Sequence, residues 1–194
     1  LFFFNEVYRI LRKGGELIID VPCSKTTYDL IGLSINEPNN LTLKRHLKSY
    51  NISNDLFNLS LNTCPTNKNV PIEWINHPVN QLSQLIACYI DGINDAHLPV
   101  ITNPEEVIKA YKNYDMNDFF EFLFDKLPEG KRYSGGHCEA WYPEKLSNIL
   151  EKKGFKTSVR FFGESELFDR TMVPDKDAPA RDAYSFKMSA IKLG

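Results

Sequence analysis

Residues 5–22, NEVYRILRKGGELIIDVP, constrain the fold more than any other part of this chain. Apolar side chains recur at helical spacing as far as Leu11, and a pair of glycines follows. Because glycine closes a helix at little steric cost, Gly14 or Gly15 is the predicted helix end. Residues 17–21 then form an apolar run, which predicts a parallel strand covered by helices on both faces. Helix, glycine turn and buried strand together make half of a βαβ unit.

Composition argues against several classes of protein. The chain has 194 residues, enough for one domain with a sizeable core, and its 42% hydrophobic and 25% charged residues are ordinary for a globular protein. A formal net charge of −2 predicts no nucleic-acid partner and no anionic membrane surface as partner. The sequence has no apolar run of the roughly 20 residues that cross a bilayer. Four scattered cysteines without a CxxC pair favour reduced thiols in the cytoplasm over a zinc site or a disulfide framework.

Residues 29–136 predict a helical insertion, or cap, laid over the sheet. Asparagine is frequent in this segment, and it has no strong alternating pattern of the kind that strands show. Helical spacing and helix-start signals predict helices over residues 41–50, 79–90, 103–111 and 117–127. Asn103, Pro104 and Glu106 have the pattern of a capping box, in which the glutamate bonds back to the N-cap residue.

Regular α/β order returns in the last third of the chain. Residues 142–154 predict a helix that has Pro143 at its first position and Gly154 at its end. Residues 155–162 predict a strand, and the alternating residues 184–193 predict a final one. Two successive strands without a helix between them are most simply antiparallel neighbours.

The order of these elements resembles the carboxyl-terminal half of the class I S-adenosylmethionine-dependent methyltransferases. Residues 5–22 resemble the helix and fifth strand of the type 11 group, with its E-x-x-R-x-L-K-P-G-G sequence. The residues that carry this match are Glu6, Arg9, Leu11, Lys13, Gly14 and Gly15, with Lys13 where the family usually has proline. WYPEKLSNILEKKGFKTSVRFFG resembles the sixth-strand unit, and AYSFKMSAIKL resembles the seventh strand, which runs antiparallel between strands five and six.

The resemblance implies an α/β fold: a partial Rossmann-like sheet of strands five to seven, the last antiparallel, with a large helical insertion. It divides the chain into core residues 1–28, an insertion at 29–136, and a second core part at 137–194. It also implies a small-molecule methyl acceptor and S-adenosyl-L-methionine as cofactor. The family holds this cofactor with a glycine-rich turn after the first strand and an acidic residue at the end of the second. This sequence has no such pair of features, so we expect a fragment that does not bind the cofactor by itself.

Candidate substrate-binding residues follow the predicted strands, because ligands of open α/β sheets bind outside the carboxyl ends of the strands. Cys23, Ser24 and Tyr28 belong to residues 23–28, a short polar loop predicted after the first strand. Trp141 and Tyr142 precede a core helix and could wall a pocket for an aromatic substrate. For all five residues an ordinary loop or packing role stays open.

His137 is the candidate catalytic base, because histidine titrates near neutral pH and many members of the family carry a histidine ahead of this helix. The alternative is a loop histidine that bonds only to backbone. A second hypothesis for the whole chain is a non-catalytic α+β binding or interaction module. With or without catalysis, the outer edge of strand 17–21 would lack a neighbour, and we expect the chain to associate with itself through that edge.

Overall fold

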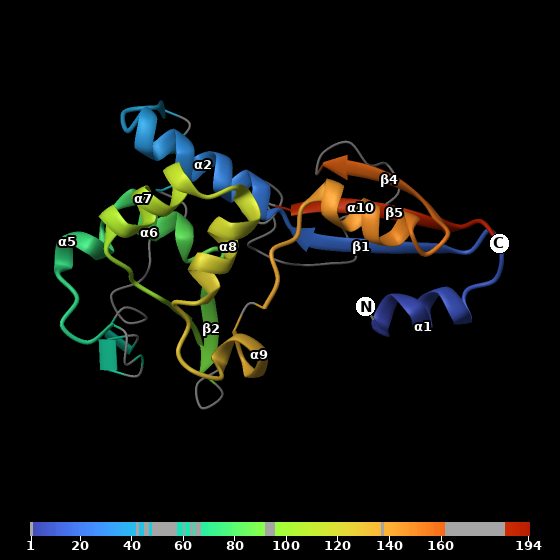
Figure 1. Ribbon diagram of the computed structural model, residues 1–194, viewed down its shortest axis with the longest axis horizontal. Coiled ribbons are helices and arrows are strands. Elements are labelled where there is room, and N and C mark those ends of the chain that lie inside the picture. The colour runs from blue at the N-terminus through green and yellow to red at the C-terminus, as the bar shows by residue number, and fades with distance from the viewer. Residues whose placement is uncertain are drawn as a thin grey trace, which may run out of the picture. The chain divides into compact units, whose positions relative to one another are not determined.

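The computed structural model describes residues 2–41, 43–44, 47, 58–59, 61–62, 64, 67–91, 96–136, 138–161 and 185–194. Contacts divide the chain into two compact units: unit 1 comprises Leu1–Cys23 and Trp141–Gly194, and unit 2 comprises Ser24–Ala140. Over the described residues the fold is mixed α/β, with short helices and two small antiparallel sheets (Figure 1). Most of the helix predicted over residues 41–50 lies outside the described residues, and the predicted domain limits at residues 28 and 136 stay predictions.

A three-stranded sheet forms the centre of unit 1. Its strands are β1 (Glu16–Pro22), β4 (Phe155–Phe161) and β5 (Ser185–Lys192), in the spatial order β1-β5-β4 (Figure 1). β5 is antiparallel to both neighbours, so β1 and β4 run parallel to each other. The predicted place of the last strand, antiparallel between the other two, is confirmed.

The helices α1 (Phe2–Ile10) and α10 (Pro143–Glu151) pack against one face of this sheet. Alternate side chains of a strand point to the same face of a sheet. On the central strand, β5, the side chains that point toward α1 and α10 are apolar. The cluster consists of Phe4, Cys23, Leu146, Leu150, Phe155, Phe186, Met188 and Ala190, all buried. The core of unit 1 is therefore built from both ends of the chain.

Among the described residues, helices cover only one face of β1, which corrects the prediction of a strand buried on both faces. Its three alternate core-facing residues are Leu17, Ile19 and Val21. On the opposite face Ile18 is 44% exposed and stands between Glu16 and Asp20. The described helices pack on the core face, so a run of five residues with four apolar side chains was not enough to indicate cover on both sides.

The glycine pair lies in the turn between α1 and β1 and is bonded to the end of β5. Gly14 has a φ of 74°, in the left-handed region where a side chain would be strained. Its N–H donates to the Lys192 carbonyl (2.9 Å), and the Lys192 N–H donates to the Gly15 carbonyl (3.0 Å). The Lys192 ammonium donates to the carbonyls of Tyr8 (2.7 Å) and Leu11 (2.8 Å), at the negative end of the helix dipole. The predicted helix end at Gly14 or Gly15 is wrong, because α1 ends at Ile10 and the glycine pair forms a separate turn, in which the Gly15 N–H donates to the Arg12 carbonyl (2.8 Å).

Unit 2 combines short helices with a two-stranded antiparallel sheet of β2 (Cys88–Asp91) and β3 (Ala96–Pro99). Its helices are α2 (Ser24–Asn36), α5 (Ile72–Ile75), α6 (Pro78–Ser83), α7 (Pro104–Asn113), α8 (Met116–Phe124) and α9 (Lys131–Ser134). Buried apolar side chains of α6, α7 and α8 form much of its interior. The helices predicted from Asn103 onward and over residues 117–127 correspond to α7 and α8 and are confirmed.

Two predictions in this part of the chain are wrong. The helix predicted over residues 79–90 ends at Ser83, and Cys88–Asp91 is a strand, so the insertion is not purely helical. Short apolar runs do not separate helix from strand by their spacing, and here the pairing of β2 with β3 decides. The loop predicted after the first strand is reduced to Cys23, because α2 begins at Ser24.

Candidate functional site

Cys23, Trp141 and Tyr142, three of the predicted substrate-binding residues, lie in unit 1. Cys23 is 3% exposed and belongs to the core cluster. Trp141 packs against the same cluster, and its ring centroid lies 6.4 Å from that of Phe4 in an edge-to-face arrangement. Tyr142 is the N-cap residue of α10, and the Lys145 Nζ lies 5.8 Å from the Trp141 ring centroid and 6.0 Å from that of Tyr142. The structure thus brings Cys23 and Trp141 together as packing residues, and their contact with substrate stays a prediction.

Ser24 and Tyr28 lie on α2 in unit 2. The Tyr28 ring centroid is 4.6 Å from that of Tyr111, within an aromatic cluster that joins α2 to α7 and α8. Burial raises the pKa of Tyr111, and the neighbouring Tyr28 and Asp29 raise it further. A Cβ on Gly32 would overlap the Tyr111 hydroxyl, so glycine is needed for this close approach. Tyr28 is therefore a packing residue in this structure, while His137 lies outside the described residues.

The second face of the sheet in unit 1 carries a charged pair that the sequence analysis did not identify. Lys187 of the central strand is only 8% exposed, and its Nζ lies 4.0 Å from the carboxylate of Asp20, its cross-strand neighbour. One step along the same face, Ser189 donates a short hydrogen bond to Glu16. The pair sits near the carboxyl ends of the parallel strands β1 and β4, where α/β proteins bind ligands. Lys187 could have been found, since it alternates with the apolar residues of the last predicted strand.

Two buried asparagines in unit 2 bind the chain segment at the end of β3. Asn67 is fully buried; its Nδ2 donates to the Pro99 carbonyl (2.9 Å) and its Oδ1 accepts from the Ile101 N–H (2.9 Å). Asn80 is 1% exposed and makes the same kind of two-sided contact with Thr102, donating to its carbonyl (2.7 Å) and accepting from its N–H (3.4 Å). These amides satisfy main-chain groups that would otherwise be buried without partners.

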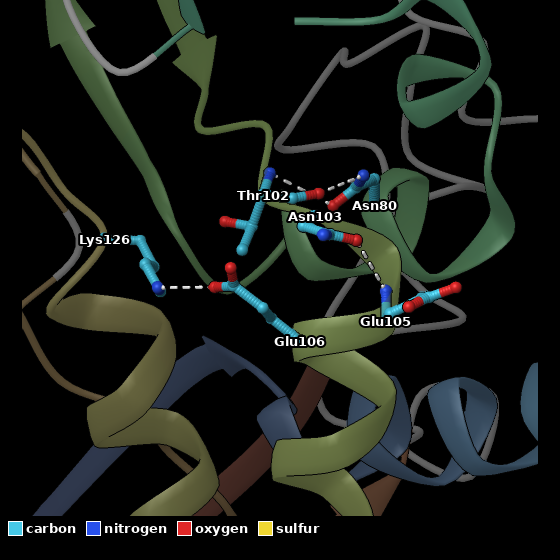
Figure 2. A network of polar contacts seen from close by, with 6 residues as sticks. All are labelled: Asn80, Thr102, Asn103, Glu105, Glu106 and Lys126. Atoms are coloured by element: carbon cyan, nitrogen blue, oxygen red, sulfur yellow. Dashed lines mark hydrogen bonds and ion pairs between the residues drawn. The ribbon is translucent and has the colours of Figure 1, made fainter.

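Figure 2 shows that this network continues into the start of α7. The Asn103 Oδ1 accepts from the Glu105 N–H (3.0 Å), which confirms the predicted N-cap. The Glu106 carboxylate does not complete the predicted capping box; it pairs with the Lys126 Nζ (3.0 Å), which follows α8. Glu106 therefore connects two helices, because a lysine from a distant part of the chain is within its reach.

The ionisable groups of unit 2 limit the chemistry that it can perform. Burial raises the pKa of the Cys88 thiol to about 12, so at neutral pH it is protonated and a poor nucleophile. Burial lowers the pKa of His77, whose Nδ1 accepts from the Val79 N–H (3.3 Å) as the N-cap of α6. An accepting nitrogen carries no proton, so His77 has a structural role in its neutral form.

The glycine pairs of the chain do not provide a cradle for the phosphate or ribose groups of a nucleotide-like cofactor. The N–H groups of Gly14 and Gly15 donate to the Lys192 and Arg12 carbonyls, and that of Gly136 donates to the Lys131 carbonyl. Such a cradle needs main-chain N–H groups that point at the ligand. Neither glycine pair therefore offers such N–H groups to S-adenosyl-L-methionine.

The comparisons with known proteins add no relative. No protein-family model matches the chain, and neither the curated proteins nor the solved structures include a match. Among the described residues, no group of three or more histidine, cysteine, aspartate or glutamate side chains could hold a metal ion. The helices described here are all too short or too polar to span a membrane.

Proposed function

We propose that this chain is the carboxyl-terminal portion of a class I S-adenosylmethionine-dependent methyltransferase that acts on a small molecule. The observation that carries the proposal is the strand order β1-β5-β4, with the central strand antiparallel to both neighbours. In the family that the sequence resembles, strands five, seven and six follow this order. A late strand inserted between two parallel ones is a more specific feature than a helix-glycine-strand motif alone.

A second feature supports the proposal, namely that the two parallel strands are preceded by equivalent units. Gly14, with a φ of 74°, lies in the turn between α1 and β1, and Gly154, with a φ of 94°, lies in the turn between α10 and β4. Both helices pack on the same face of the sheet through Phe4, Leu146 and Leu150. Parallel strands need crossover connections, and helices that cover the sheet are the usual ones.

In the proposed enzyme this chain contributes the residues that bind the substrate, and another part of the polypeptide binds the cofactor. The proposed substrate-binding residues are Cys23, Ser24, Tyr28, Trp141 and Tyr142. His137 is the proposed base, which would accept a proton from the methyl acceptor. Since neither glycine pair offers free N–H groups to the cofactor, we expect the 194-residue chain to be inactive by itself.

The test compares the 194-residue chain with the longest polypeptide that its gene encodes. We expect the longer polypeptide to bind S-adenosyl-L-methionine with a micromolar Kd in calorimetry, and to transfer a tritiated methyl group to small molecules of a cell extract. The 194-residue chain should give no heat of binding under the same conditions. His137→Asn in the longer polypeptide should lower turnover by about 100-fold while leaving cofactor binding unchanged.

Two results would contradict these expectations. A longer polypeptide that binds no cofactor would refute the proposed enzyme class, and would leave the non-catalytic interaction module as the better hypothesis. Micromolar binding by the 194-residue chain would refute the inference that it lacks the cofactor site. Unchanged turnover of the His137→Asn variant would remove only the role of the base.

A further inference from the structure

The two outer edges of the sheet in unit 1 differ in how they are protected against pairing with another strand. Natural proteins protect free edges with charged residues, lysine above all. β4 carries an exposed cation, Lys156. β1 has no cationic residue. By this criterion the edge of β4 is protected and the edge of β1 is not.

The two acidic residues of β1 do not protect its outer edge either, because both interact with the central strand. Glu16 accepts from the Ser189 hydroxyl, and Asp20 lies 4.0 Å from the Lys187 Nζ. Ile18 stands between them and is 44% exposed. In the described part of the chain, β5 is the strand that pairs with β1, and no second one adjoins it.

We propose that the outer edge of β1 binds β1 of a second copy of this chain, in an antiparallel pair with its two-fold axis at Ile19. The alternation of side chains requires that core-facing residues lie opposite core-facing residues, so the axis must pass through a residue. An axis at Ile19, the middle of Glu16–Pro22, pairs all seven residues of the strand. Leu17 of each copy then lies opposite Val21 of the other, and Ile18 lies opposite Asp20.

The neighbouring register, with its axis at Ile18, is less favourable for two reasons. It would place Glu16 of each copy opposite Asp20 of the other, and like charges directly opposite each other destabilise a sheet. It would also leave Val21 and Pro22 opposite the glycine turn of the other copy instead of opposite strand residues. Charge and overlap therefore select the axis at Ile19.

This inference does not rest on the proposed methyltransferase function, since it concerns pairing of the 194-residue chain whatever reaction the complete protein performs. Sedimentation velocity of that chain should show a monomer–dimer equilibrium. Ile18→Glu should weaken the dimer at least about tenfold, because it places a carboxylate opposite Asp20 of the second copy. Ile18→Lys should leave the dimer at least as strong, because the new ammonium faces the same carboxylate. Ser158→Glu is the matched control, since Ser158 occupies the same cross-sheet row on β4.

The outcomes distinguish the register with its axis at Ile19 from the one with its axis at Ile18. They also distinguish pairing through the edge of β1 from pairing through the edge of β4. A chain that stays monomeric at every concentration overturns the proposal, and so does a Ser158→Glu variant that weakens the dimer as much as Ile18→Glu. Equal weakening by Ile18→Glu and Ile18→Lys would instead place the axis at Ile18. Thermal melting followed by circular dichroism verifies that each variant is folded.

A cross-linking experiment tests the same register without added charges. In a Cys138→Ser background, Ile19→Cys should form a disulfide between two copies under mild oxidation, because residues on the axis have their Cα atoms about 4.5–5.5 Å apart. Leu17→Cys should not, because each Leu17 faces Val21 of the other copy. A cross-link that forms with Leu17→Cys and not with Ile19→Cys overturns the proposed register.

Discussion

Removing the Asn80 side chain should destabilise unit 2 far more than removing an exposed asparagine. Asn80 is 1% exposed and donates to two main-chain carbonyls, those of Trp74 and Thr102, each at 2.7 Å. It also accepts from the Thr102 N–H at 3.4 Å, a weak bond. Asn80→Ala leaves these groups without the amide, and a buried group that loses its partner costs about 1–3 kcal/mol. Counting the two short bonds, we expect a loss of about 2–6 kcal/mol.

The matched control is Asn113→Ala. Asn113 is the last residue of α7, and its exposed side chain makes one bond, to the Lys109 carbonyl (2.6 Å). Water can replace that bond, and alanine has the higher helix propensity, so the change should be within about 0.5 kcal/mol. Both variants lose the same atoms from the same residue type. A difference between them therefore reports the burial and the partners of Asn80.

Urea unfolding followed by tryptophan fluorescence measures this difference. A Trp141→Phe background removes the tryptophan of unit 1, so that Trp74 reports on unit 2. Asn80→Asp provides a further test, because a carboxylate that faces two carbonyl oxygens has no hydrogen to donate. At pH 7 this variant should have a lower free energy of unfolding than Asn80→Ala. Its penalty should fall at acid pH, where the buried carboxyl group is protonated. Equal unfolding free energies for Asn80→Ala and Asn113→Ala would refute the reasoning.

Three further predictions concern single ionisable groups. Because burial lowers the pKa of His77 below its ordinary value of 6.5, its contribution to stability is present above pH 6.5 and is lost as the pH falls through the folded pKa. His77→Asn, which keeps a capping side chain, should reduce this acid dependence in urea unfolding at pH 5 and 7. Lys192→Met should lose about 1–3 kcal/mol with its two bonds to the end of α1, whereas exposed Lys152→Met should change little in the same assay. Iodoacetamide at pH 8 should label exposed Cys138 within minutes and should not label buried Cys88, because burial raises the pKa of the Cys88 thiol to about 12. Mass spectrometry of the folded chain measures the labelling, and equal labelling of both cysteines would contradict the prediction.

Features with short-range causes could be predicted from the sequence. The left-handed glycines Gly14 and Gly154 occupy the turns that follow α1 and α10, because only glycine adopts that conformation at little cost. The Asn103 cap bonds to an N–H two residues away. The place of the last strand followed from its alternation and from the family resemblance, and the observed strand order and direction agree.

Features with long-range causes could not be predicted. Asn67 bonds to residues 32 and 34 positions away, and Asn80 bonds to Thr102, 22 positions away. The sequence showed that asparagine is frequent, but not which of these residues are buried. The candidate site has the same difficulty, since Cys23 was chosen for its place after a strand and is enclosed by the core through contacts with distant segments. Local pattern places a residue on an element, and tertiary packing decides whether a ligand can reach it.

The outer edge of β1 is the place where the two proposals can be tested against each other. A Rossmann-like methyltransferase sheet must continue past β1 with a parallel strand, and that strand would occupy the edge that a second copy takes in the 194-residue chain. A dimer of the short chain that disappears in a cofactor-binding longer polypeptide is compatible with both proposals. If the longer polypeptide also cross-links through Ile19→Cys, its β1 has no room for a further strand. The methyltransferase proposal would then fail, whatever the strand order β1-β5-β4 suggests.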